Sequence, residues 1–421
     1  MDRVRKKSSL YTAAAMWPAF AAIILAVCIV LMPDQAFQAS LAGLTIWWQF
    51  VFPSLLPFFM LSEMLYAYGV VHGAGSLLDP LMRRVFRLPG SAGLALSASL
   101  AGGFPAAADL AAKLHRDGAI GSNEAGRMAS LFHLSSPLTI VIVIGAGFFS
   151  RPEIGGALAI VHYASGLLAA LLLAHIPFRT RSAGQSSKDQ SLQAQSGSPS
   201  TWSKSVSACR SAAQKDGRSF GRLLGDTVTV SVQKLLALGA CMIMFSVIAH
   251  VFGKLGGTAI LYPLGKVIGW PSGAEYGGIS GLFEAHLGAF SFSRLTVPDS
   301  FILPLASACL AWGGFSGHLQ ALGLLHSARI SYLCFAGVRL LHAGLAYALY
   351  AAWGPGLQQW LSQLQPVFVP AESAAAQERA VSWLSLWPSW PLVPLLFCCS
   401  ICLLLSFSFI VFRYLRPPHK Q

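Results

Sequence analysis

One short stretch of the chain combines residues that could bind a polar ligand with residues that weaken a helix. Gly277–Ala289 reads GGISGLFEAHLGA and carries an acid, Glu284, and a histidine, His286, inside a strongly apolar region. Glycine destabilises a helix interior, and an ionisable side chain within lipid is costly and usually functional. A helix that is broken where it lines a water-filled cavity accommodates both. The stretch, which includes Gly281, therefore predicts half of a transport site.

A second stretch, Ser99–Asp109, has similar features. Gly102, Gly103 and Pro105 interrupt an apolar run whose two flanks are basic. Because basic residues mark the cytoplasmic side, the run is predicted to enter and leave on that side as a re-entrant segment; a kinked spanning helix is the alternative. Backbone N–H groups at such a break, together with the helix dipole, can hold a carboxylate. Phe104 could stack on an aromatic ring.

Each stretch is followed by small, hydroxyl and histidine residues that begin or interrupt the next apolar run. After the first stretch they are His133, Ser135, Ser136 and Pro137, and after the second they are Trp312, Gly313, Gly314, Ser316 and His318. Helix packing would explain such residues equally well, but their matching places favour a site. Arg339 is the one mid-span base, and it is assigned to a buried anion or to Glu284. His162 and His342 are predicted to be packing residues.

The acid Glu284 is not predicted to bind an anionic substrate directly, because two negative charges repel. A proton carrier or an anchor for unwound backbone fits better, and a purely structural pair with His286, His318 or Arg339 is the alternative. Asp109 is predicted to be either a surface acid or a site residue. The proposed binding residues are Ser99, Gly102, Gly103, Phe104, Pro105, Ser135, Ser136, Gly281, Glu284, His286, Trp312, Ser316, His318 and Arg339.

Composition identifies the elements that must position these residues. The chain has 421 residues, of which 55% are hydrophobic and 11% are charged, with a net charge of +13. A soluble domain carries roughly 25% charged residues, so the sequence predicts an all-α polytopic membrane protein. The basic residues gather in loops and tails, which indicates the positive-inside rule and not nucleic-acid binding. Enzyme motifs, a nucleotide-binding loop, and cofactor or metal sites are not apparent, so an enzyme is not expected.

Apolar runs of about 20 residues predict about eight spans plus re-entrant segments, with both termini cytoplasmic. The expected segments are a tail and first span (1–40), a first repeat (41–178), a basic cytoplasmic linker (179–224), a second repeat (225–353), and an outer loop with the last span (354–421). Outer loops are expected at Pro33–Ser40 and Gly354–Ser385, and one span at Met128–Phe149. The linker Arg179–Arg222 is predicted to be disordered, with contact to anionic lipids as the alternative.

The two halves repeat one order of features. Leu77–Pro105 and Ile260–Leu287 each contain a short amphipathic piece, a proline turn and a glycine-rich re-entrant segment. The preceding spans, Leu41–Tyr66 and Leu235–Phe252, are predicted to run in opposite directions, which makes the repeat inverted. Broken helices that meet near the membrane midplane are a common transporter design.

Five stretches resemble the sporulation integral membrane protein YlbJ family, also called SpoVV. This family lies in the nucleoside-recognition Gate superfamily, which is similar to concentrative nucleoside transporters. The stretches are Trp47–Phe59 (WWQFVFPSLLPFF), Gly69–Arg84 (GVVHGAGSLLDPLMRR), Gly102–Leu110 (GGFPAAADL), Gly281–Gly288 (GLFEAHLG) and Trp312–His318 (WGGFSGH).

The resemblance implies a protein of the outer forespore membrane that moves dipicolinate from mother cell toward forespore during spore maturation. Its partners would be the small anion and the lipid bilayer; a homo-oligomer or a complex with other sporulation membrane proteins stays open. One departure concerns Ala106–Ala107–Ala108–Asp109, which stands where the family pattern continues with Gly-Ala and a base. The alternatives are transport of nucleosides or another small metabolite, and a non-transporting sporulation scaffold.

Overall fold

The computed structural model describes residues 19–174, 201–267, 270–271, 273–328 and 330–363, and within these ranges the chain is helical without strands. Five helices are long and apolar enough to cross a membrane: Pro33–Ala67, Pro152–Leu173, Phe220–Pro263, Asp299–Leu324 and Tyr332–Gln363. Three shorter helices in the described part of the chain are also apolar: Ala19–Leu31, Ala92–Gly102 and Thr139–Phe148. The predicted all-α polytopic membrane fold is confirmed. The number of spans and their orientation stay predictions, and the expected last span at 386–412 lies outside the described residues.

The helices follow one order in each half of the chain. The first half contains α2 (Pro33–Ile46), η1 (Trp47–Val51), α3 (Phe52–Ala67), α4 (Val70–Arg84), α5 (Ala92–Gly102), α6 (Phe104–Arg116), α7 (Ser122–Leu131), η2 (Thr139–Phe148) and α8 (Pro152–Leu173). The second contains α10 (Phe220–Phe252), η3 (Gly253–Gly257), α11 (Thr258–Val267), α12 (Ala274–Phe283), α13 (Ala285–Ser293), α14 (Asp299–Trp312), α15 (Gly314–Leu324), η4 (His326–Ala328) and α16 (Tyr332–Gln363). In both series a long helix and a short helix precede two pairs of broken helices and a closing helix.

Two helix pairs fold back on themselves as hairpins. The α5–α6 pair turns at Gly103, whose φ of 76° and ψ of −158° suit only glycine. The α12–α13 pair turns at Glu284, and its arms touch through Gly281 and Gly288. A Cβ added to Gly288 would lie 2.3 Å from the Gly281 Cα, so the arms approach this closely only because both residues lack side chains.

Two further helices are interrupted instead of folded back. The α14–α15 break lies at Gly313 and Gly314, with φ of 83° and 69°. The α7–η2 break is longer, because residues 132–136 are not helical and η2 continues as a π-helix. The span predicted at Met128–Phe149 therefore contains a non-helical segment, which lies where His133, Ser135 and Ser136 were predicted to begin or interrupt the apolar run. Its physical cause is that side chains from neighbouring helices satisfy the backbone groups of the unwound segment, as described below.

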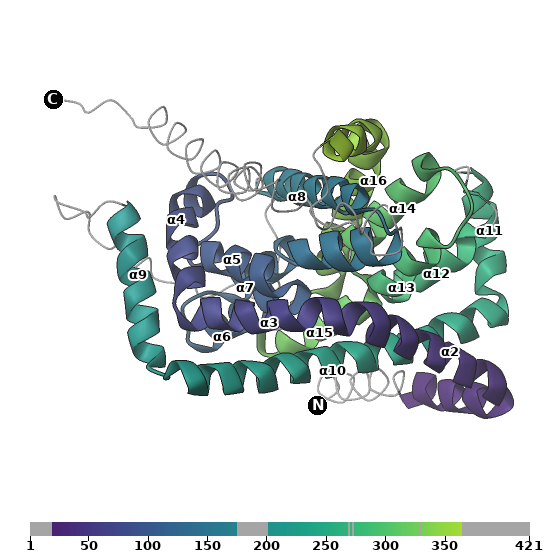
Figure 1. Cartoon of the computed structure of the whole chain (residues 1–421), viewed down its shortest axis with the longest axis horizontal. Helices are drawn as coiled ribbons and strands as arrows, with labels where there is room; N and C mark the ends of the chain where they lie inside the picture. The colour runs from purple at the N-terminus through teal and green to yellow at the C-terminus, as the bar shows by residue number, and fades with distance from the viewer. Residues whose placement is uncertain (1–18, 175–200, 268–269, 272, 329, 364–421) are drawn as a thin grey trace, which may run out of the picture.

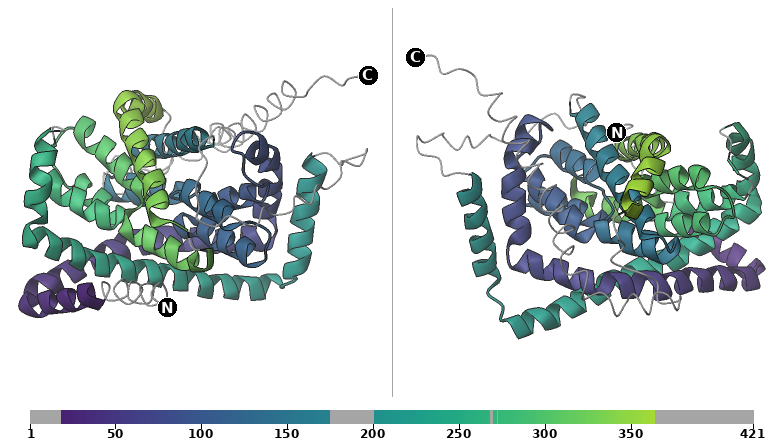
Figure 2. Two further views of the ribbon diagram at one scale, coloured as in Figure 1. Left: turned by 180° about the vertical axis from the view of Figure 1, so that it is seen from behind. Right: turned by 45° about the horizontal axis from the view of Figure 1, so that its top comes forward.

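A long pair of helices supports these elements from one side. In Figure 1, α10 runs along α3 and α2 at the lower edge of the molecule. The Trp47 indole N–H donates to the Leu235 carbonyl at 2.9 Å, and the Ser246 hydroxyl donates to the Ala39 carbonyl at 2.7 Å. Figure 2 shows α16, in yellow-green, crossing the molecule from its edge to its middle. It packs against both α8 and α14 and so joins the two halves.

Helix extends into two of the predicted outer loops. The prediction of a loop at Pro33–Ser40 is wrong, because these residues form the start of α2. Proline is tolerated at the first position of a helix, since the N–H that it lacks would have no partner within the helix. Within the outer loop expected at Gly354–Ser385, an amphipathic segment was predicted at Gly356–Leu364, and the structure shows that α16 continues without a break through it to Gln363. Residues 364–385 lie outside the described part of the chain.

The expected disordered linker is also wrong over α9 (Thr201–Asp216). This helix packs on α4, where the Ser205 hydroxyl donates to the Gly73 carbonyl at 2.9 Å. A Cβ on Gly69 would lie 2.2 Å from the Cys209 carbonyl oxygen, so the helices meet through small residues. Tertiary packing overrides the polar composition that predicted disorder. The remaining linker residues, 179–200, lie outside the described ranges.

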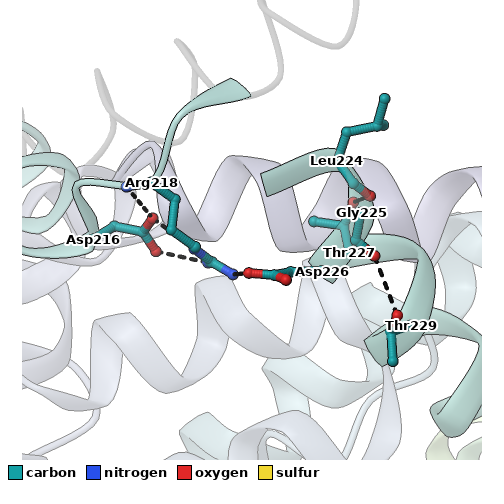
Figure 3. Close-up of polar contacts among 7 residues, drawn as sticks. All are labelled: Asp216, Arg218, Leu224, Gly225, Asp226, Thr227 and Thr229. Carbon is teal, nitrogen blue, oxygen red and sulfur yellow. Dashed lines mark hydrogen bonds and ion pairs between the residues drawn. The ribbon is translucent and has the colours of Figure 1, made fainter. Parts of the chain in front are cut away.

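The corner between α9 and α10 is held by charges (Figure 3). The Arg218 guanidinium lies between two acids, 2.7 Å from Asp216 and 3.0 Å from Asp226. These hydrogen bonds from Arg218 lower the pKa of Asp216. The corner therefore fixes where the polar segment ends and the long apolar helix begins.

Candidate functional site

The tip of the first hairpin lies against the unwound segment between α7 and η2. The Ser99 hydroxyl donates to the Phe132 carbonyl at 2.6 Å. A Cβ on Gly103 would lie 3.6 Å from the Ser136 backbone nitrogen, which places the two residues side by side. The Ser136 hydroxyl accepts a hydrogen bond from the Thr139 N–H at 3.2 Å and thereby caps the helical turn that begins at Pro137 and continues into η2. The predicted neighbours Ser99, Gly103 and Ser136 are thus brought together.

The unwound segment is also bound by α8. The Ser135 N–H donates to the His162 ring at 3.1 Å, and the Tyr163 hydroxyl donates to the Ser135 carbonyl at 2.7 Å. Because a backbone N–H can only donate, the His162 Nε2 must be the unprotonated nitrogen of the ring. His162 therefore holds the site's backbone, a role that the prediction of simple packing missed.

The tip of the second hairpin is built around Glu284, which is 3% exposed. One carboxylate oxygen accepts from the Leu287 N–H at 2.8 Å, and the other lies 2.7 Å from the His286 Nδ1. Glu284 is thus the N-cap of α13, and its ion-pair partner is His286, not Arg339. The Glu284 carboxylate therefore accepts a hydrogen bond from a free N–H group at the N-terminus of α13.

The second tip packs on the α14–α15 break. A Cβ on Gly314 would lie 2.8 Å from the Glu284 Cα, and the Trp312 indole N–H donates to the Leu282 carbonyl at 3.0 Å. The His318 Nε2 lies 2.9 Å from the Trp312 carbonyl oxygen, to which it donates a hydrogen bond. Each hairpin tip is therefore bound to a break in the helix pair that follows it.

The two halves meet at His133. Its ring centroid lies 4.9 Å from that of Phe104 and 6.1 Å from that of His318. A Cβ on Gly313 would lie 3.1 Å from the His133 Nε2. The first hairpin tip, the first unwound segment and the second break therefore surround one imidazole.

Arg339 on α16 is fully buried. Its Nη1 donates to the Ser130 carbonyl at 3.4 Å, and its Nη2 donates to the Ala311 carbonyl. In the described part of the chain it has no carboxylate within ion-pair distance. The nearby His342 ring lies 4.9 Å from that of His162, and its Nε2 lies 3.0 Å from the His162 carbonyl.

Several buried polar atoms in this region lack a hydrogen-bond partner among the described residues. They are both ring nitrogens of His133, the Ser135 hydroxyl, the Nδ1 atoms of His162, His318 and His342, the Nε2 of His286 and the Nε of Arg339. Buried polar groups in proteins are normally bonded. This concentration of donors and acceptors marks a region that can bind a polar molecule.

Other predicted residues have different surroundings. Gly281 packs against Gly288 and Cys309 within the second hairpin. Ser316 accepts from the Gln320 amide at 3.2 Å on α15. Gly102 ends α5, and Pro105 lies in the first turn of α6.

Asp109 lies on the surface of α6, where it pairs with Lys113 at 2.6 Å. Its exposed carboxylate is therefore not one of the buried polar atoms described above. No group of three or more His, Cys, Asp or Glu residues that could hold a metal occurs among the residues that were placed.

This geometry defines a class: a polytopic helical membrane protein in which two sets of broken helices enclose a buried polar centre. The Gate family model, described as nucleoside recognition, matches residues 49–174, which contain α3 to α8. The chain is 34% identical over 372 residues to the sporulation integral membrane protein YlbJ of Bacillus subtilis strain 168. The aligned region covers 87% of this chain and 88% of that protein. The chain belongs to the YlbJ family of sporulation integral membrane proteins, and the family predicted from its motifs is confirmed.

Proposed function

We propose that this protein transports a small organic anion across the membrane at the meeting point of its four helix breaks. The observation that carries the proposal is the fully buried Arg339, which has no carboxylate partner in the described part of the chain. The two carbonyls that it binds carry no formal charge, so neither contact neutralises the positive charge of the Arg339 guanidinium. Such a charge is costly within a membrane, and an anion bound nearby offsets the cost.

Dipicolinate is the proposed substrate, because it is a planar aromatic ring with two carboxylates. The unpaired Ser135 hydroxyl and histidine nitrogens can donate to carboxylate oxygens. The N-terminus of α6, which begins at Phe104, has no side-chain cap and adds a favourable dipole. The rings of Phe104 and Trp312 offer surfaces for stacking. In a sporulating cell this transport would deliver dipicolinate from mother cell toward forespore.

Reconstitution into liposomes tests the proposal directly. Purified protein should give saturable uptake of labelled dipicolinate, and Arg339→Gln should reduce it at least about tenfold. Arg218→Gln is a matched control, because it removes an arginine from the α9–α10 corner, far from the breaks along the chain. Saturable uptake that is equal in wild type and in Arg339→Gln would contradict the assignment of the site.

Nucleoside transport is the second candidate, because the family model that matches residues 49–174 is described as nucleoside recognition. Labelled uridine in the same liposomes separates the two substrates. Uridine uptake without dipicolinate uptake would replace the anion by a nucleoside. If neither compound moves, and cells with Arg339→Gln form spores of normal dipicolinate content, the scaffold alternative is correct.

A further inference from the structure

The contacts of Arg339 show an unexpected symmetry between the two halves. Its two acceptors, Ser130 and Ala311, are each the penultimate residue of a broken helix. The first helix, α7, ends at Leu131, and the second, α14, ends at Trp312. One side chain on α16 therefore binds the same position of both helices, immediately before each break.

These carbonyls need such a partner because of the breaks. In a continuous helix the Ser130 carbonyl would accept from the N–H of Leu134, but that N–H donates to the Phe132 carbonyl instead, at 2.8 Å. The last carbonyls of any helix lack intrahelical partners, and inside a membrane they cannot rely on water. The forked guanidinium is the side chain that can reach two such groups at once.

The charge of Arg339 suits the same positions. The C-terminal end of a helix carries a partial negative charge, and the ends of α7 and α14 both face this guanidinium. Each helix end stabilises the buried cation, and the cation stabilises each helix end. The interaction therefore supports the broken conformation of both helices over a continuous one.

We infer that Arg339 is a positioning residue that locks the two breaks to α16, so that the two half-sites keep one fixed geometry. Its Nη1 and Nη2 each donate to a backbone carbonyl, which ties the two helix ends to α16, while its Nε has no partner among the described residues. It acts on a bound anion through its field and through the shape of the two unwound segments. This inference rests on the proposed transport site for its functional consequence, but its structural part is independent of the substrate.

Hydrogen exchange in detergent tests the structural part without transport. Arg339→Gln should raise exchange at least about tenfold at residues 131–138 and also at 311–316, while α2 and α10 stay unchanged. Arg339→Lys should do the same, since an ammonium retains the charge but lacks the fork. Arg218→Gln serves as the control and should alter neither segment. Exchange that is unchanged in both segments, or raised in only one, overturns the inference.

Substrate affinity then distinguishes positioning from direct contact. Dipicolinate has two carboxylates and picolinate has one, so Arg339→Gln, which removes the field of the charge, should weaken dipicolinate more in either case. Arg339→Lys keeps the charge but lacks the fork, so positioning predicts that both compounds lose affinity by the same factor in this variant. A loss that is selective for dipicolinate in Arg339→Lys indicates contact with its second carboxylate and overturns the inference. If wild-type protein binds neither compound but exchange rises in both segments of the variants, the positioning role stands and the proposed substrate fails.

Discussion

The capping of α13 by Glu284 gives a prediction whose size can be worked out from its contacts. Glu284→Ala removes the acceptor of the Leu287 N–H, which lies at 2.8 Å, and the partner of the His286 Nδ1, which lies at 2.7 Å. Loss of an N-cap costs about 1 kcal/mol. A buried ring nitrogen left without a partner costs about 1–3 kcal/mol. The alanine variant should therefore be less stable by about 2–4 kcal/mol.

Glu284→Gln should cost only about 1 kcal/mol. Its amide oxygen can still accept from Leu287, and its amide nitrogen can donate to a neutral His286. The difference between the two variants isolates the polar contacts, because glutamine keeps the shape of glutamate. The glutamine variant also removes the ionisable group, so it separates anchoring of the backbone from proton carrying.

Unfolding titrations of the purified protein in mixed micelles with an ionic detergent would measure these stabilities. Glu153→Ala is the control, because Glu153 forms a more exposed pair with Arg151 at 2.9 Å and should cost about 0–1 kcal/mol. Equal destabilisation by alanine and glutamine at position 284 would show that charge, and not capping, is essential. An alanine variant as stable as wild type would refute the capping argument.

Three further predictions use the same protein. Gly288→Ala should destabilise the second hairpin by about 1–3 kcal/mol in the same titration, because its Cβ would lie 2.3 Å from the Gly281 Cα; Gly337→Ala, with open space around it, should not. Ser99→Ala should lower dipicolinate uptake and cost about 1–3 kcal/mol, because the Phe132 carbonyl loses its 2.6 Å donor, and uptake equal to wild type would contradict this role. Since Arg218 lowers the Asp216 pKa below its usual 3.8, the corner contact contributes stability above that value and is lost as pH falls through the depressed pKa. Pepsin cleavage between α9 and α10 should therefore rise steeply at low pH in wild type but not in Arg218→Gln, and equal profiles would refute the pairing.

The positions of the glycine-containing breaks could be read from the sequence. Gly103, Gly313 and Gly314 adopt positive φ values, and clustered glycines in an apolar run predict such interruptions directly. The confirmed family and the all-helical membrane fold follow from equally local signals, which are motif spacing and apolar length.

The break between α7 and η2 could not be predicted in this way. Residues 132–136 contain no glycine, and Pro137 accounts only for the last of them, because a proline disfavours helix at the residue before it. The rest of the segment is held unwound by Ser99, Tyr163, His162 and Arg339, which bind backbone groups in or beside it. These partners are distant in sequence, so the pattern around the break carries no sign of them. An ionisable residue in the middle of an apolar run was the available signal for His162, and it was interpreted as packing.

The role of Arg339 was only half visible from sequence. Its position in an apolar run predicted a buried, functional base. Its actual acceptors are main-chain carbonyls on two other helices, and no side-chain pattern identifies a main-chain partner. The surface position of Asp109 follows from the rotation of α6 about its axis, and the sequence alone does not determine which face of α6 packs inward.

The close approach of α9 to α4 gives the protein a native reporter thiol. The Cys209 sulfur lies against Gly73, where a Cβ would be only 2.2 Å from it, and the residue is partly exposed, so separation of the two helices should increase the access of a bulky alkylating reagent to that sulfur. The rate at which Cys209 is labelled therefore measures how often α9 separates from α4. In a variant whose other cysteines are replaced with serine, Cys209 alone would be labelled, and its labelling rate would report that motion.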